Sequence, residues 1–454
     1  MNSSSENSAQ NTLVRNLGFP QSFSLVVGTV IGTGVFLKAA TMSNLVGSSM
    51  MVLVAWIAAG ILSLIGAFCY AEIGSRFPRA GGEYVYLKEA YGDLPAFLFG
   101  WMRFWIASPG SIAAYGVGAA TFLKNLGYHQ TSTMAIAFIL IFTVLNCFSV
   151  KFGGAIQTFI TALKILIVIG IALAIFSVTD AANFTKNFGP ESPIVWNGWS
   201  SFGMAMLAAL WAFDGWNNMP MAAGEIHHPE KNIPRALVFG MLGVLVVYLL
   251  ANLAYYFALP FSEVVASYSK ANPNALPVAA RAAGVVLGES AAQFLTIAFV
   301  ISALGAMNGS ILTGARVPYA MSKDGLFFKS LGKINSSSHS PVLAVIAQGI
   351  VSVALALSGS FDQLTDYVVF ASWIFYGAVA ASIFIFRNKE KAGVIKTDGK
   401  IFRTPFYPWV PALFIISSLL LLINTLINST RDSLIGLAFI VVGIPVFFYF
   451  KKRA

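Results

Sequence analysis

Residues 28–36 read Gly28-Thr29-Val30-Ile31-Gly32-Thr33-Gly34-Val35-Phe36 and lie inside an apolar run, residues 19–46, that is long enough to cross a lipid bilayer. Each of the three glycines weakens a helix by about 1 kcal/mol relative to alanine. An unpaired backbone group is costly in hydrocarbon, so a helix that opens here must line a cavity or be buried in protein. Two interpretations fit this stretch. Either its free N–H and C=O groups hold a solute, or Gly28 and Gly32 form a GxxxG pair that packs against a neighbouring helix.

The composition excludes a soluble domain. The chain has 454 residues, of which 57% are hydrophobic and only 10% charged, and its mean hydropathy is +0.75. Soluble domains carry about 25% charged residues, so these values indicate a membrane protein with many spans. Residues 1–14 are polar and rich in Ser and Asn, which predicts a disordered cytoplasmic tail rather than a cleavable signal.

The remaining composition narrows the class of partner. The net charge is +10, but the basic residues lie in loops between apolar spans, so no nucleic acid is expected. Cys69 and Cys147 both lie in apolar runs, and we interpret them as small buried hydrophobes. The four histidines lie in predicted loops, so neither a metal nor a cofactor is expected.

Spans of about 20 apolar residues are the repeating unit of the chain. We predict twelve of them, at residues 19–46, 51–73, 94–123, 132–150, 154–178, 199–225, 236–259, 290–320, 341–359, 364–386, 409–427 and 433–450. The fold class is therefore an all-α integral membrane protein with twelve transmembrane helices. With the N-terminus inside, most loop lysines and arginines fall on the cytoplasmic side, so both termini are predicted to be cytoplasmic.

The sixth span contains a second polar interruption, Leu210-Trp211-Ala212-Phe213-Asp214-Gly215-Trp216-Asn217-Asn218-Met219-Pro220. Asp214 lies about 22 Å along the span at 1.5 Å per residue, too deep to reach either surface. The interrupted spans are the first and the sixth, with five spans in each half of the core. Interrupted spans at matching positions of two halves point to a transporter site at the bilayer midplane. This coincidence favours the solute-binding interpretation of residues 28–36.

Five spans are an odd number, so the second half crosses the membrane in the opposite sense to the first. The sequence thus predicts a 5+5 inverted repeat, helices 1–5 and 6–10, whose broken helices 1 and 6 meet near the centre. We assign residues 15–387 to this transport core. Residues 388–454 are expected to hold helices 11 and 12 and a cytoplasmic C-terminus.

Two opened helices offer partners for both charges of a zwitterion, because each half-helix has a positive and a negative end. The carboxylate is expected on the free N–H groups near Gly32, Thr33 and Gly34. The ammonium is expected on the carbonyls near Val30 and Ile31, together with those near Trp211 and Phe213. An α-amino acid is therefore the natural ligand.

Three further side chains in the spans are candidates for function, each with an alternative. Lys164 is an intramembrane lysine that either replaces a coupling cation or carries a proton, unless it pairs structurally with helix ends or a carboxylate. Asp214 either caps the broken helix or contacts the substrate, which would favour basic side chains. Trp211 is large enough to close over a small ligand, or it is a packed core residue. Asn217, in the same interruption as Asp214, is taken with Lys164 and Trp211 as a coupling or gating candidate.

Other charged residues are expected to be structural. Arg103 is expected to pair with a neighbour or with lipid headgroups. Glu72 and Glu225 lie at cytoplasmic helix ends, where salt bridges of a gate or a loop are expected.

Several stretches together resemble the L-type amino acid transporters of the amino acid–polyamine–organocation superfamily. They are residues 28–36 themselves, Cys69-Tyr70-Ala71-Glu72, Gly81-Gly82-Glu83-Tyr84, Leu94-Pro95-Ala96-Phe97, Asn146-Cys147-Phe148-Ser149-Val150-Lys151, Trp211-Ala212-Phe213-Asp214-Gly215-Trp216-Asn217 and Asn232-Ile233-Pro234. The resemblance runs in order from about residue 13 to residue 450. It implies a LeuT-like inverted repeat that works by alternating access.

The resemblance also implies roles for single residues. The first-helix glycines and the carbonyls of Trp211, Ala212 and Phe213 would hold the amino acid backbone. Trp211 falls where the family has an aromatic gate. Lys164 falls where a fifth-helix lysine stands in for a sodium ion, close to the first and eighth helices, which implies sodium-independent exchange.

One departure from the family bears on partners. Eukaryotic light chains carry a cysteine after helix 3 that links to a heavy chain, whereas residues 124–133 hold none here. No disulfide-linked heavy chain is therefore expected, and the chain is similar to a bacterial member that works alone among membrane lipids in the plasma (inner) membrane. A further departure is Asp214, which replaces the glycine of some members.

These observations predict a sodium-independent antiporter that exchanges neutral, small to medium L-amino acids. The alternatives are a proton-coupled symporter in which Lys164 titrates, and an exchanger that also accepts cationic amino acids. An enzyme is not expected, because the histidines are scattered over loops and the spans carry few carboxylates.

Overall fold

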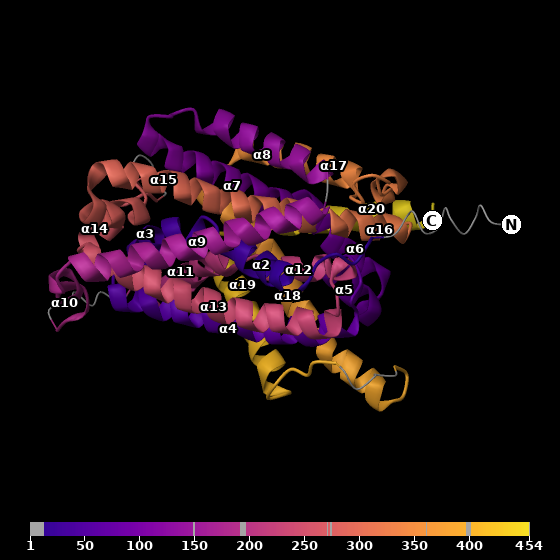
Figure 1. Cartoon of the computed structure of the whole chain (residues 1–454). Coiled ribbons are helices and arrows are strands. Elements are labelled where there is room, and N and C mark those ends of the chain that lie inside the picture. Colours follow the sequence, from indigo (N-terminus) through magenta and orange to yellow (C-terminus); the bar gives the residue numbers. More distant parts are fainter. Residues whose placement is uncertain are drawn as a thin grey trace.

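The computed structural model describes residues 13–148, 150–190, 197–269, 271–272, 275–359, 361–395 and 401–453. Within these residues the chain is a single bundle of helices, most of which run along a common axis (Figure 1). The α-helices are α2 (Phe19–Val30), α3 (Gly34–Val46), α4 (Ser49–Arg76), α5 (Glu83–Tyr91), α6 (Asp93–Met102), α7 (Ser108–Leu123), α8 (Thr131–Phe148), α9 (Val150–Val178), α10 (Ala182–Phe188), α11 (Gly198–Phe213), α12 (Asn218–Met221), α13 (Pro229–Ala258), α14 (Phe261–Val265), α15 (Val278–Gly314), α16 (Arg316–Lys323), α17 (Val342–Ser358), α18 (Phe361–Lys391), α19 (Trp409–Asn428) and α20 (Thr430–Lys451).

Short helical turns join some of these helices. A π-helical turn, η1 (Arg103–Ala107), connects α6 to α7, and the 3-10 turns are η2 (Lys124–Leu126), η3 (Ala223–Glu225) and η4 (Lys329–Gly332). In the described residues, strand-like pairing is limited to one isolated bridge, between Leu17 and Ile226.

Ten helical segments of the described chain are long and apolar enough to cross a membrane. They are Phe19–Val46, Ser49–Arg76, Asp93–Leu123, Thr131–Phe148, Gly154–Val178, Pro229–Ala258, Thr296–Lys323, Gln363–Lys391, Trp409–Asn428 and Ser433–Lys451. The other two predicted spans correspond to shorter apolar helices, Gly198–Phe213 and Val342–Ser358. The protein is thus an all-helical membrane protein, and the number of twelve crossings stays a prediction.

The first predicted span lies inside the bundle. In its most apolar window 94% of the residues are buried, against 22% for the window in α8 and 22% for that in α19. Side chains such as Phe159, Leu166 and Ile350 on outer helices are about two-thirds exposed or more. In a membrane these apolar side chains contact lipid, whereas α2 and α3 are surrounded by protein.

The two ends of the described chain lie at the same end of the bundle. Leu13 lines a surface pocket with Lys323 and Asp324, at the end of α16. The ring of Phe450, at the end of α20, lies 5.6 Å from that of Phe327, in the loop that follows α16.

The connection between α4 and α5, residues 77–82, turns back toward the interior of the bundle. Gly81 and Gly82 have positive φ angles of 108° and 51°. The Gly81 N–H donates to the Met221 carbonyl at 2.9 Å, and a Cβ on Gly82 would lie 3.0 Å from the Met221 nitrogen. This close turn, which glycine alone permits without strain, directs α5 into the molecule, so that Glu83 is fully buried.

Candidate functional site

The first broken helix opens at residues 31–33. Helix α2 ends at Val30, α3 begins at Gly34, and Ile31 leaves the helical region with ψ at 85°. The Gly32 N–H bonds instead to the Val30 carbonyl at 2.8 Å. The opening is narrower than the predicted stretch, because Gly28, Thr29 and Val30 are still helical.

The second broken helix opens after Phe213, where α11 ends. Asp214 is extended and Gly215 has a φ of 111°, a left-handed conformation that favours glycine. Helix α12 then begins at Asn218. Trp211 and Phe213 therefore belong to the last turn of α11, where carbonyls lack partners within the helix.

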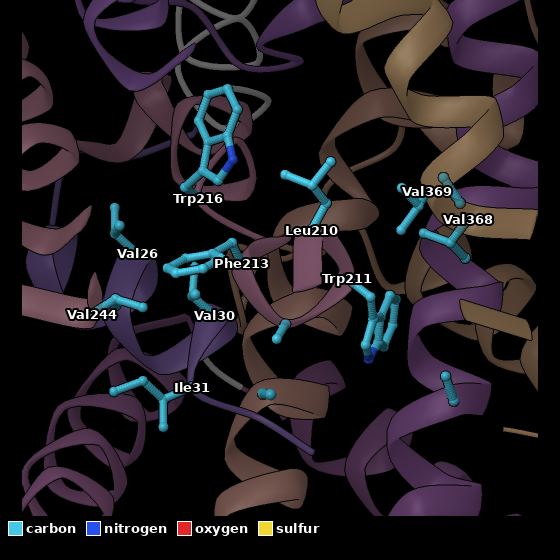
Figure 2. Close-up of a cluster of buried hydrophobic side chains, with 14 of the residues drawn as sticks. Val26, Val30, Ile31, Leu210, Trp211, Phe213, Trp216, Val244, Val368 and Val369 are labelled. Carbon is cyan, nitrogen blue, oxygen red and sulfur yellow. The ribbon is translucent and has the colours of Figure 1, made fainter. Parts of the chain in front are cut away.

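The two breaks are in direct contact. The Thr29 hydroxyl lies 2.9 Å from the Gly215 carbonyl and shares its single hydrogen between that carbonyl and the Leu25 carbonyl of its own helix. A Cβ on Gly34 would lie 2.5 Å from the Ala212 Cα, so only glycine fits at this position. Figure 2 shows Val30 beside Phe213, and Trp211 pointing away from Phe213 on the other side of α11.

One tyrosine hydroxyl joins the two breaks. Tyr248 of α13 lies 2.7 Å from the Val30 carbonyl and 2.8 Å from the Ala212 carbonyl, and it donates to both. A hydroxyl has a single hydrogen, so the two carbonyls share it. One acceptor from each broken helix is thereby held at the same point.

A buried ammonium group lies at the first break. Lys164 of α9 is 1% exposed, and its Nζ donates to the carbonyls of Gly28 at 2.8 Å, Ile31 at 2.6 Å and Ser302 at 3.0 Å. An ammonium has three donors, and these three bonds use all of them. The charge of Lys164 therefore joins the first broken helix to α15.

The backbone groups proposed for a zwitterion differ in availability. Four of the five candidate carbonyls already accept hydrogen bonds: Val30 and Ala212 from Tyr248, Ile31 from Lys164, and Trp211 from the Asp214 N–H. Within the described chain, the Phe213 carbonyl accepts none.

Fewer of the candidate N–H donors at the first break are already hydrogen-bonded. The Gly32 N–H is used, as described above, whereas the N–H groups of Thr33 and Gly34 lie at the start of α3, where a helix supplies no acceptor. The Thr33 hydroxyl is buried and has no partner among the described residues.

Trp211 lies in an aromatic cluster on one side of the break. It is 2% exposed, and its ring centroid is 5.5 Å from that of Tyr115 and 6.3 Å from that of Phe361. The Lys38 Nζ lies 5.0 Å from the centre of the Phe361 ring and donates to the Thr365 hydroxyl at 2.9 Å. These contacts pack Trp211 against side chains from α7 and α18 and link α3 to the start of α18.

The Asp214 side chain is engaged within the protein. It is 4% exposed, and its Oδ1 accepts the Tyr376 hydroxyl at 2.8 Å. Helix α12 has no side-chain cap hydrogen bond, so the capping and the substrate-contact interpretations of Asp214 both stay predictions.

A layer of buried polar groups lies on the other side of the second break. Asn217 donates from Nδ2 to Glu83 Oε1 at 2.9 Å, and the Tyr70 hydroxyl donates to the same oxygen at 3.1 Å. Arg103 donates from Nη2 to Asn218 Oδ1, so it pairs with a neighbour, as predicted. Sequence reasoning missed Glu83, although the Gly81-Gly82 pair before it signals a close turn toward the interior.

Two predicted salt bridges are confirmed farther along the same side. Arg316 of α16 binds Glu225 through Nε to Oε1 at 2.7 Å and Nη2 to Oε2 at 3.2 Å, with both side chains 1% exposed. Arg387 binds both Glu72 oxygens, at 2.9 and 2.7 Å.

Comparison with known proteins places this geometry in a wider context. A family model described as amino acid permease matches residues 17–449. The chain is 32% identical over 448 residues to a serine/threonine exchanger of Bacillus subtilis (strain 168), covering 98% of each chain. It is 30% identical to the b(0,+)-type amino acid transporter 1 of Homo sapiens (97% of this chain, 88% of that one). It is 29% identical to the human cystine/glutamate transporter (96% and 85%).

Proposed function

This chain belongs to the amino acid permease family, and on that premise we propose that it is a sodium-independent antiporter that exchanges neutral, small to medium L-amino acids. The names of the similar proteins support exchange of an amino acid, and the bacterial relative is named for serine and threonine. We further propose twelve crossings, a LeuT-like 5+5 inverted repeat, and cytoplasmic termini in the plasma (inner) membrane.

The observation that carries the proposal is the contact between the two breaks. The start of α3 offers the N–H groups of Thr33 and Gly34 to a carboxylate, and the end of α11 offers the Phe213 carbonyl to an ammonium. A helix N-terminus favours an anion and a helix C-terminus a cation. A zwitterion matches both ends, and no charged side chain has to be committed to it.

The environment of Lys164 supports sodium independence. Its ammonium occupies a point where three carbonyl oxygens converge, the kind of donor set that also binds a hard cation. A fixed charge there does the work of a bound cation in joining the first broken helix to α15. Transport then needs no sodium to assemble the site.

The packing supports alternating access. In this conformation the Gly34–Ala212 contact fills the space between the breaks, and side chains pack against them on both sides. Substrate binding therefore requires the breaks to separate. We propose that each side opens in turn, with Trp211 as the gate on one side and Asn217 moving with α12 on the other.

Counterflow in proteoliposomes tests this function. Vesicles loaded with unlabelled serine are expected to take up labelled serine or alanine, and replacing sodium with choline is expected to leave the rate unchanged. Empty vesicles supply the control. Equal uptake into empty and loaded vesicles would contradict exchange, and a requirement for sodium would contradict the assignment of Lys164.

A second candidate, exchange that also accepts cationic amino acids, is favoured by the Asp214 carboxylate buried beside the break. Under this candidate, lysine or arginine competes with labelled serine, and Asp214→Asn removes that competition while serine exchange continues. If Asp214→Asn stops all exchange, the carboxylate serves only to cap the break.

A further inference from the structure

The buried polar layer between α5 and the second broken helix contains two oxygen atoms that lack hydrogen-bond partners and that a single proton could join. Asn217 donates to Glu83 Oε1, yet Glu83 Oε2 and Asn217 Oδ1 are both buried and have no partner among the described residues. Both of these atoms are acceptors if Glu83 is ionised. The unpaired atoms thus belong to the same two groups that already share one hydrogen bond.

A proton on Glu83 gives both unpaired oxygens, Glu83 Oε2 and Asn217 Oδ1, a hydrogen-bond partner. A carboxylic acid has one O–H donor in addition to its acceptor oxygens, and an amide faces it with one acceptor and two donors. The acid then donates from Oε2 to Asn217 Oδ1 while Asn217 Nδ2 donates to Oε1. An ionised carboxylate in the same place would leave a buried charged oxygen unpaired, which costs more than a neutral unpaired atom.

We propose that Glu83 binds a proton in this conformation and shares it with Asn217, and that this acid–amide pair holds α12 against α5 until the proton leaves. The inference rests on the proposed exchange function, to which it adds a proton-binding site that controls opening. The site lies on the same side of the breaks as the Glu225–Arg316 and Glu72–Arg387 pairs.

The charged surroundings allow the proton to be gained and lost. No cationic nitrogen of the described residues lies within salt-bridge distance of the Glu83 carboxylate. Arg103 binds Asn218 instead, and its Nε and Nη1 have no partner among the described residues. The titratable groups that act on Glu83 come from several elements: Tyr70 of α4, Tyr86 of α5, Arg103 of η1, Asp214 after α11 and Tyr376 of α18.

The balance of these influences sets the pH range. In sequence, helix α5 lies between two candidate membrane spans and belongs to neither. Burial raises the pKa of Glu83 from its ordinary value of 4.5 to about 7, while Arg103, Asn217 and Tyr70 act to lower it. Between these two values this conformation holds a proton that an exposed glutamate has lost. Rising pH therefore disfavours the closed pair and favours opening.

The first test measures serine counterflow at a series of pH values. The pH is varied on the side of the vesicle membrane on which α5 lies. Wild-type exchange is expected to rise as the pH increases through about 7. Glu83→Gln keeps an uncharged donor and acceptor, so its exchange is expected to stay at the wild-type low-pH rate throughout. Glu89→Gln, on the exposed side of the same helix, is the matched control and keeps the wild-type profile.

A second variant keeps the titratable Glu83 and is expected to shift the pH at which exchange changes. Tyr70→Phe removes a hydrogen bond to the charged form of Glu83, so the midpoint of the pH profile is expected to move upward. A wild-type rate that does not change with pH, or a step that survives Glu83→Gln, overturns the inference. A step that survives Glu83→Gln and disappears in Lys164→Ala assigns the proton to Lys164 instead.

Infrared difference spectra of the purified protein test the proton without transport. Between about pH 6 and about pH 8.5 the wild type is expected to lose a protonated-carboxyl band that Glu83→Gln lacks and Glu89→Gln keeps. Absence of this band in the wild type overturns the inference. If no amino acid gives counterflow but the band is present, the exchange function fails and the proton site stands.

Discussion

At the scale of single residues, the site depends on side chains that satisfy an opened backbone. Lys164 donates to two carbonyls of the first broken helix and to one of α15, and Tyr248 holds one carbonyl of each break. Opened backbone inside a membrane protein persists only where such partners replace the lost helical hydrogen bonds. Removing a partner therefore affects the backbone that is proposed to hold the substrate.

Lys164→Ala is expected to reduce exchange by at least about tenfold, because hydrogen bonds to charged groups contribute about 1.5–3 kcal/mol each. It also leaves the Gly28, Ile31 and Ser302 carbonyls converging on an empty position. Sodium is therefore expected to raise the melting temperature of this variant, measured in detergent against choline. Lys186→Ala, at an exposed lysine of α10, is the control. No sodium effect on Lys164→Ala would contradict the proposed stand-in role.

At the scale of elements, the two breaks form one unit. Helix α3 begins where α11 ends, with the Gly34 backbone packed on Ala212 and Gly215 packed on Thr29. The lack of side chains at Gly34 and Gly215 brings the free N–H groups of one helix close to the free carbonyl of the other. Each break alone offers half of a zwitterion site, and their contact provides the whole.

Gly34→Ala is expected to abolish exchange while the protein still inserts in the membrane. Its Cβ would lie 2.5 Å from the Ala212 Cα and 2.6 Å from the Ala212 Cβ. Adding Ala212→Gly removes only the second clash, so the double variant is expected to stay inactive. Gly170→Ala, on α9 with open space around it, should exchange normally. Full recovery in the double variant would show that the backbones do not need this contact. The measurement is serine counterflow per amount of reconstituted protein.

At the scale of the whole molecule, ion pairs on one side join distant helices. Glu225 follows the second broken helix, and its carbonyl accepts the N–H groups of Asn16 and Leu17, which precede the first. Its carboxylate binds Arg316 of α16. A single glutamate therefore connects the approaches to both broken helices with the helix after α15. We infer that opening on this side must break these contacts together.

Arg316→Ala is expected to destabilise the closed conformation strongly, since removing one partner of a buried pair costs about 3–5 kcal/mol. Thermal unfolding of the detergent-solubilised protein measures this loss. Arg316→Met combined with Glu225→Met removes both charges and is expected to recover part of it. Arg79→Ala, whose partner Glu89 is exposed, should cost about 0–1 kcal/mol. An equal effect of Arg316→Ala and Arg79→Ala would contradict the structural role of the buried pair.

Much of the site could be predicted from sequence, because its causes are local. Glycines and threonines inside an apolar run weaken one helix at residues 28–36, and Asp214 and Gly215 interrupt another, whatever lies beside them. A lysine in the middle of a span, Lys164, is conspicuous for the same reason. These features established a helical membrane protein with two interrupted spans and a candidate zwitterion site, along with the resemblance to a transporter family.

Only the tertiary structure decided which groups meet. It limited the first opening to residues 31–33, engaged four of the five candidate carbonyls, and brought Tyr248 between the breaks. It also joined Glu83 to Asn217 across 134 residues and Arg316 to Glu225 across 91. Local composition determines where a helix is weak, because backbone hydrogen bonding within a helix is a short-range property. Which side chains then pair with the opened backbone depends on how distant helices pack, which no single stretch of sequence records.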